Sequence, residues 1–166
     1  ELYAKNNPVG VGNVNLKPEE IDTLELAFLY EPITNLTTGL SLYKFEAENM
    51  IDYIQAGNIK VAQNNTNLTG QGFEIELDWI INDEMELLVN YANQSTKNDA
   101  TDVEVAFNPK QQLYIDVRRK MLPKWTVSSQ LNLVADRERA QGDTRSDVGD
   151  YALVDLTIRH KKNDWG

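Results

Sequence analysis

Apolar and polar residues alternate along seven stretches of the chain, and this period of two predicts β-strands with one apolar and one polar face. The stretch Gln71–Ile80 shows the pattern most clearly, because every second residue from Phe73 to Trp79 is apolar and each residue between them is a carboxylate. Carboxylates on one strand face cannot lie in a dry core. We therefore expect this face to meet water. The seven predicted strands are Thr23–Tyr30, Leu36–Glu48, Gln71–Ile80, Met85–Ser95, Gln111–Lys120, Trp125–Ala135 and Tyr151–His160.

The second predicted strand is the least regular of the seven. Leu36, Leu40 and Leu42 fall on one face, whereas Tyr43 and Phe45 fall on the other. A β-bulge shifts the alternation of side chains by one residue. We expect such a bulge, or a position at the rim of the sheet, near Tyr43.

The connectors between these strands are of two kinds, and the two kinds alternate along the chain. Three are short and suit tight hairpins: Glu31–Asn35, Asn82–Glu84 and Met121–Lys124. Three are long and polar, and we expect them to be loops: Asn49–Gly70, Thr96–Lys110 and Asp136–Asp150. Strict alternation places all tight turns at one end of the sheet and all long loops at the other. The predicted fold class is therefore all-β, an antiparallel up-and-down meander of about seven strands.

The amino-acid composition excludes several classes of function. The 166 residues suit one domain, and 26 acidic against 16 basic residues give a net charge of −10, which disfavours nucleic acid as a partner. The chain has no cysteine and one histidine, His160, which excludes a disulfide framework, a thiol nucleophile and a metal site built on cysteines or several histidines. We expect no cofactor, no metal centre and no enzymatic activity.

The longest apolar run, Leu26–Tyr30, is far shorter than the roughly 20 residues of a membrane-spanning helix. No signal peptide is expected near Glu1, since no basic segment precedes an apolar one there. A low mean hydropathy is nevertheless compatible with a transmembrane β-barrel, whose strands alternate between lipid and lumen. Outer-membrane barrels also combine short turns at one end with long loops at the other.

Two other classes share parts of this pattern. A soluble β-sandwich that serves as a binding module, for instance for carbohydrate, also has alternating strands. A passive porin has the same strand and loop asymmetry. The length of the strands, about that needed to cross a bilayer, and the charge on their polar faces favour the membrane barrel over the sandwich.

Three sequence blocks carry a resemblance to a known family. Gly12-Asn13-Val14-Asn15-Leu16-Lys17-Pro18-Glu19 leads into the first predicted strand, Gly70-Gln71-Gly72-Phe73-Glu74 into the third, and Tyr151-Ala152-Leu153-Val154-Asp155-Leu156 forms the last. In this order they resemble the TonB-dependent receptors of the Gram-negative outer membrane. The resemblance covers nearly the whole chain.

This resemblance implies a 22-stranded barrel around a plug domain. Its cargo would be a scarce small metal chelate, such as a ferric siderophore, haem or a cobalamin-like molecule, imported with energy from the TonB complex. Membrane lipid would cover the apolar strand faces. Residues 1–166 are then a partial barrel from the C-terminal part, with the plug, the early strands and the terminal strands absent.

The candidate cargo-binding residues lie in the predicted long loops. Arg137, Arg139 and Arg145 share one loop, and guanidinium groups bind carboxylates in a bidentate manner. The alternative is that these arginines are neutralised by the acidic residues of the same loop. Tyr53, together with Tyr3, is a candidate for aromatic contact. Arg118, Arg119 and Lys120 precede a tight turn, and we expect them to form a cationic rim or to pair with carboxylates of the lumen such as Asp116.

Overall fold

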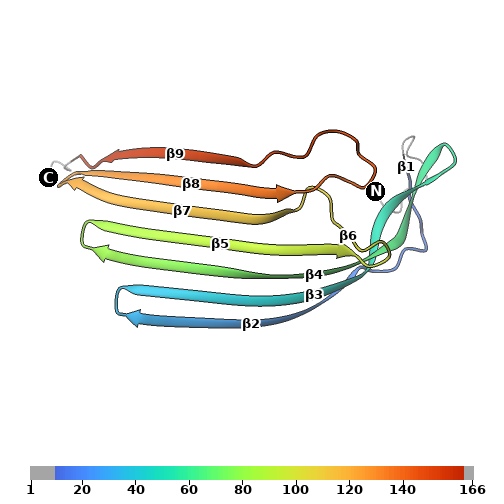
Figure 1. The fold of residues 1–166 in the computed structure, drawn as a ribbon, viewed down its shortest axis with the longest axis horizontal. Coiled ribbons are helices and arrows are strands. Elements are labelled where there is room, and N and C mark those ends of the chain that lie inside the picture. Colours follow the sequence, from blue (N-terminus) through green and yellow to red (C-terminus); the bar gives the residue numbers. More distant parts are fainter. Residues whose placement is uncertain (1–9, 163–166) are drawn as a thin grey trace. The chain divides into compact units, whose positions relative to one another are not determined.

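The computed structural model describes residues 10–162, which contain nine β-strands and no helix (Figure 1). One predicted feature, Tyr3, lies outside the described residues. The strands are β1 (Gly10–Val11), β2 (Glu20–Ile33), β3 (Leu36–Ala56), β4 (Ile59–Asn82), β5 (Met85–Asn98), β6 (Val103–Glu104), β7 (Pro109–Leu122), β8 (Trp125–Arg137) and β9 (Tyr151–His160). Within residues 10–162, a helix long and apolar enough to cross a membrane is not found.

The long strands follow one another in the sheet in the order β2-β3-β4-β5-β7-β8-β9, while β1 pairs with β4 and β6 with β5. β5, β7, β8 and β9 pair antiparallel with their neighbours. This confirms the predicted meander of about seven strands. A β-sandwich would need a second sheet packed against the first, whereas the described strands form one sheet.

The three predicted tight turns are confirmed. β2 and β3 are joined by residues 34–35, β4 and β5 by residues 83–84, and β7 and β8 by residues 123–124. Asparagine side chains support two of these turns. The Asn35 carboxamide donates to the Ile80 carbonyl of β4, and the Ile80 N–H donates to the Asn35 backbone oxygen at 2.8 Å. In the turn between β4 and β5, the Asn82 carboxamide oxygen accepts the N–H of Glu84 at 2.9 Å. Such local side-chain contacts are the reason that asparagine favours turns.

The prediction of a long loop at Asn49–Gly70 is wrong. β3 continues to Ala56 and β4 begins at Ile59, so that the connection is a two-residue turn containing Gly57, whose φ of 66° suits a glycine. The pattern did not reveal these strand extensions because apolar and polar residues are mixed on both faces, so no single apolar stripe marks the period. The Thr96–Lys110 loop is also shorter than predicted, since β6 pairs with the end of β5.

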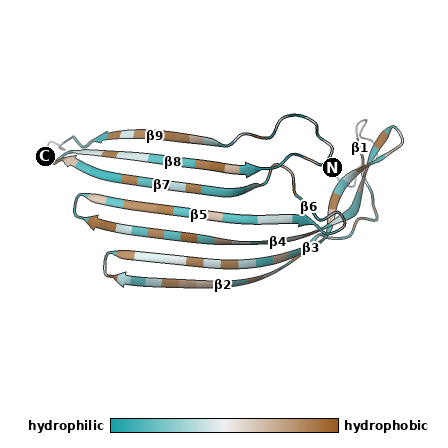
Figure 2. Cartoon of the chain, in the orientation of Figure 1, coloured by the Kyte–Doolittle hydropathy of each residue, from teal (hydrophilic) through white to brown (hydrophobic). Residues whose placement is uncertain are grey.

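The chain forms two compact units. One consists of Glu1–Leu24, Lys44–Gln71 and Thr96–Val105; the other consists of Glu25–Tyr43, Gly72–Ser95 and Ala106–Gly166. In the second unit, the strand registers place the predicted faces in continuous rows. One row is apolar and consists of Val89, Ile115, Leu131 and Val154. The next row is on the opposite face and contains Asp116, Gln130 and Asp155. Figure 2 shows the resulting alternation of hydrophobic and hydrophilic residues along the strands.

Tyr43 lies on the polar face without the predicted bulge. Exposed and less exposed residues alternate without interruption from Leu40 to Glu48, and the left-handed residue of this strand is Asn49, with φ of 57°. The prediction of a bulge near Tyr43 is therefore wrong. The aromatic rings fit on the polar face because glycines lie opposite them: Phe45 covers Gly70, and Tyr43 covers Gly72.

The apolar face has little protein covering it. Among the described residues, the buried apolar side chains are Ala47, Ala62 and Val134. Large apolar residues on the outer strands are exposed instead, with Phe28 at 58% and Leu156 at 67%. A fully covered Leu or Phe side chain gains about 1.5–3 kcal/mol relative to an exposed one. The sheet therefore needs an apolar environment on this face.

Candidate functional site

The last residue of β8, Arg137, and the loop between β8 and β9 carry three of the four predicted site residues. The loop begins where Asp136 adopts a left-handed backbone conformation (φ of 55°), and it turns at Gly142 (φ of 85°). The loop closes on itself at its base, where Arg137 forms a β-bridge with Val148 and the Asp150 carboxylate accepts the N–H of Asp136 at 3.0 Å. These contacts give an ordered frame to a segment without regular secondary structure.

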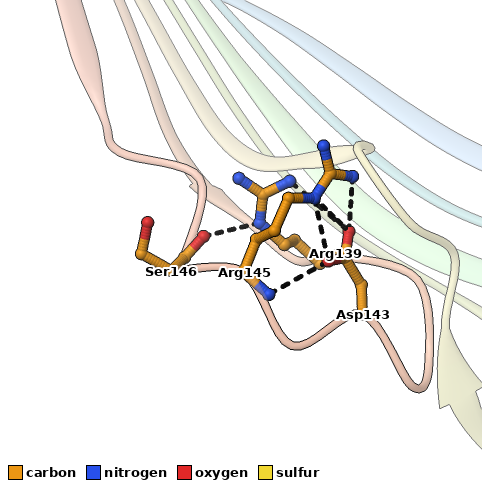
Figure 3. A network of polar contacts seen from close by, with 4 residues as sticks. All are labelled: Arg139, Asp143, Arg145 and Ser146. Atoms are coloured by element: carbon orange, nitrogen blue, oxygen red, sulfur yellow. Dashed lines mark hydrogen bonds and ion pairs between the residues drawn. The ribbon is translucent and has the colours of Figure 1, made fainter.

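Asp143 is the centre of a polar network within this loop (Figure 3). Arg145 binds its carboxylate in a bidentate manner, with Nε 3.0 Å from Oδ1 and an Nη 2.7 Å from Oδ2. Arg139 lies 3.5 Å from the same carboxylate, and its Nε donates to the backbone oxygen of Ser146. Hydrogen bonds from the side chain and backbone N–H of Arg145 lower the pKa of Asp143 to about 2, and the charge of Arg139 adds to this effect. Two of the predicted arginines thus hold the loop in shape.

Arg137 differs from the other two arginines. One of its Nη groups donates to the backbone oxygen of Gly149 at 2.6 Å, and its guanidinium carbon lies 4.9 Å from the centre of the Tyr151 ring. Its Nε is buried without a hydrogen-bond partner. Within residues 10–162, no carboxylate forms an ion pair with it, so its charge is not neutralised in the way that the charges of Arg139 and Arg145 are.

A hollow of about 640 Å³ lies beside this loop. It is lined by both signs of charge: Lys110, Asp136, Arg137, Glu138, Arg139, Ala140, Asp143, Asp147, Val148 and Asp150. Lys110, from β7, contributes an ion pair with Glu138 at 2.5 Å. Sequence reasoning missed Lys110, because it is 28 residues from Glu138 and no motif joins them. The hollow can offer a ligand both hydrogen-bond donors and acceptors.

Tyr53, the fourth predicted residue, belongs to the other compact unit. It lies in β3 beyond Asn49 and is 37% exposed. Its ring lies against Gly10 of β1, where an added Cβ would come within 2.9 Å of a ring carbon. The structure therefore brings the three arginines together in one loop and gives Tyr53 a separate environment.

The polar face of the second unit also carries paired charges near the tight turns. Arg118 binds Glu86 at 2.9 Å, as their direct opposition in the sheet allows. Asp116 does not pair with Arg118; its Oδ2 accepts a hydrogen bond from Gln130 at 3.0 Å. The expected pairing of Arg118 with a carboxylate is therefore confirmed, but its partner is Glu86 and not Asp116, because residues two apart on one strand are farther from each other than cross-strand neighbours.

Comparison with known proteins identifies relatives of this fold. Residues 1–165 match the family model "TonB dependent receptor-like, beta-barrel". No curated relative matches the chain in sequence. Among solved structures, the ferric-catecholate import receptor Fiu of E. coli superposes with a TM-score of 0.72 at 12% identity, over 96% of this chain and 24% of that one.

Two further structures show the same likeness. The copper transporter OprC has a TM-score of 0.74 at 17% identity, over 94% of this chain and 26% of its own. The ferric enterobactin receptor PfeA of Pseudomonas aeruginosa has a TM-score of 0.74 at 19% identity, over 93% of this chain and 25% of its own. The chain therefore spans about a quarter of the length of these solved structures.

Proposed function

Because this chain belongs to the TonB-dependent receptor-like β-barrel family, we propose that it is part of a receptor in the outer membrane of a Gram-negative bacterium that imports a scarce small chelate. Members of this family are transporters and not enzymes. In the proposed full-length receptor, further strands complete a 22-stranded barrel, a plug domain fills it, and the TonB complex supplies the energy.

The two-faced sheet is the observation that carries this proposal. The row through Ile115 is apolar across four strands, while the adjacent row through Asp116 is mostly polar. A sheet with this contrast suits lipid on one side and an aqueous lumen on the other. Membrane lipid is thus the proposed partner of the apolar face, and it supplies the apolar surroundings that the exposed side chains of β2 and β9 need.

The cargo that we propose is a small metal chelate with anionic groups, such as a ferric siderophore, haem or a cobalamin-like molecule. Arg137, Arg139, Arg145 and Tyr53 are its proposed contact residues. The geometry supports Arg137 most strongly, because this cation has no ion pair within residues 10–162. Arg139 and Arg145 contribute by shaping the loop around Asp143.

The test is to neutralise the three arginines in the full-length receptor, as R137Q, R139Q and R145Q together, and to measure binding of a panel of iron, haem and cobalamin chelates by calorimetry. A charged hydrogen bond contributes roughly 1.5–3 kcal/mol, so losing one such contact lowers affinity about tenfold or more. R137Q alone should account for most of this loss. K124Q, at a tight turn, is the matched control and should leave affinity unchanged.

Two results would contradict the proposal. Unchanged affinity in the triple variant, at equal abundance in the membrane, would mean that these arginines do not contact cargo. Uptake that persists in cells without TonB would indicate a passive porin instead of an energised receptor.

A further inference from the structure

Residues 13–19, which we call the strap, contain most of the Gly-Asn motif before β2. The strap has a turn of its own, in which the Asn13 side-chain oxygen accepts the N–H of Asn15 at 2.9 Å. Its partner is the polar hairpin, residues 49–67, formed by the extended ends of β3 and β4. Both segments lie within the same compact unit, and neither supplies a large buried apolar side chain. Polar contacts must therefore hold them together.

One side chain of the hairpin makes two of these contacts and a third hydrogen bond within the hairpin itself. The Asn64 carboxamide accepts the backbone N–H of Lys17 at 2.8 Å and donates back to the Lys17 carbonyl at 3.0 Å. The Asn64 side chain therefore forms the same pair of hydrogen bonds with Lys17 that a residue of a neighbouring strand would form. Its Nδ2 also donates to the carbonyl of Asn49 at 2.5 Å. A single amide thus uses both of its N–H donors and also its oxygen as an acceptor.

Asn49 is the point at which β3 changes direction. It has a left-handed backbone (φ of 57°), which asparagine tolerates better than most residues do. Asn67 accepts its N–H at 3.1 Å while Asn64 holds its carbonyl. The backbone N–H and the backbone carbonyl of Asn49 are therefore both hydrogen-bonded to side chains of β4.

A second contact joins the strap to the hairpin independently of Asn64. The Glu19 carboxylate accepts the N–H of Ile51 at 2.8 Å. Before the strap, Gly10 and Val11 pair in parallel with Lys60 and Val61 of the hairpin. The strap is therefore attached to the hairpin on both sides of Lys17.

We propose that Asn64 is a latch that couples the strap to the hinge at Asn49, so that the strap and the polar hairpin order and release together. The cause is geometric, because one amide forms hydrogen bonds both to the strap, at Lys17, and to Asn49 of the hairpin. This coupling does not depend on which cargo the receptor binds. It makes opening of the hairpin a cooperative event controlled from the segment that precedes β2.

The experiment is amide hydrogen exchange at single-residue resolution on the full-length protein in detergent, comparing the unmodified chain with N64A and N64D. Asn64→Ala removes all three hydrogen bonds; Asn64→Asp keeps the acceptor for Lys17 but places a carboxylate against two carbonyls. We expect exchange to rise about tenfold or more at Lys17 and also at Ile51. Ile51 is the decisive position, since its own partner, Glu19, is unchanged in both variants.

Asn65→Asp is the matched control, because Asn65 is the next residue and its exposed side chain lies on the other face of the strand. It adds the same charge and should leave exchange at Lys17 and Ile51 unaltered. Faster exchange at Lys17 alone would overturn the proposal, since Asn64 would then be a local contact and not a latch.

The reciprocal variant keeps the proposal testable if Asn64 variants fail to assemble. Glu19→Ala frees the N–H of Ile51, and coupling requires that it also accelerate exchange at Lys17, which Glu19 does not contact. Unchanged protection of Lys17 in E19A would equally refute the latch.

Discussion

Tyr43 lies directly over Gly72, so that a Cβ at position 72 would come within 2.6 Å of the Tyr43 hydroxyl oxygen and 2.5 Å of the Asn93 backbone oxygen. The glycine is required here by close approach, since its backbone conformation is not left-handed. This explains why an aromatic residue can occupy the polar face of β3, and it accounts for the Gly-Gln-Gly step before the most regular strand.

Gly72→Ala should lower the free energy of unfolding by about 1–3 kcal/mol, because the added methyl group overpacks the space under Tyr43 and meets a backbone atom that cannot rotate away. Urea unfolding of the full-length receptor in lipid, followed by tryptophan fluorescence, measures the change. Gly39→Ala is the control, since its Cβ would lie at an ordinary 3.6 Å from Glu76. Equal stability of G72A and G39A would contradict the close contact.

The two faces of β7 predict opposite responses at adjacent residues. Ile115→Arg should destabilise the barrel by about 2–4 kcal/mol if Ile115 lies near the middle of the bilayer. Asp116→Asn should change stability by less than about 1 kcal/mol, because an amide at position 116 can keep the hydrogen bond with Gln130. A refolding titration into lipid vesicles compares them. Similar losses in the two variants would refute the assignment of faces.

The network around Asp143 predicts a loop that loosens in acid. The pKa of Asp143 is about 2 in the folded chain, against about 3.9 in an unfolded one. A depressed folded pKa stabilises the loop above the unfolded value, and this contribution is lost as the pH falls from about 4 to about 2.

A spin label on a single cysteine at Gln141 reports this change, and the chain has no native cysteine to interfere. Its mobile fraction should rise between pH 4 and pH 2. In D143N the label should be mobile throughout, with little dependence on pH in that window. A pH response of the same size in D143N would show that another group controls the loop.

Successive connectors of an up-and-down sheet lie at opposite ends of its strands, and this predicts sidedness in the outer membrane. Single cysteines at Asn58 and Gln141 should react with a membrane-impermeant maleimide in intact cells that express the full-length receptor. Cysteines at Asp83 and Lys124, in the tight turns, should react after the outer membrane is permeabilised. Labelling of the tight turns alone in intact cells would reverse the topology and refute the orientation.

The strands and tight turns in the second unit were predictable because their signals are local. Side chains alternate across any extended backbone, so a strand between lipid and water has a period of two regardless of its neighbours. The turn at residues 83–84 is likewise stabilised by a neighbour in sequence, because the side chain of Asn82 accepts the N–H of Glu84. The grouping of Arg137, Arg139 and Arg145 follows from their closeness in the chain.

Pairings between distant segments were decided only in the tertiary structure. At the ends of β3 and β4 apolar and polar residues are mixed on both faces. What makes these ends strands is hydrogen bonding across a turn, which leaves no mark in the order of side chains. Likewise, Asn64 meets Lys17 across 47 positions, and the charge of Arg137 stays without an ion pair because the closed loop places Gly149 and Tyr151 beside it. Alternation follows from the geometry of a single strand, whereas these contacts exist only after the strands have paired and the loops have closed.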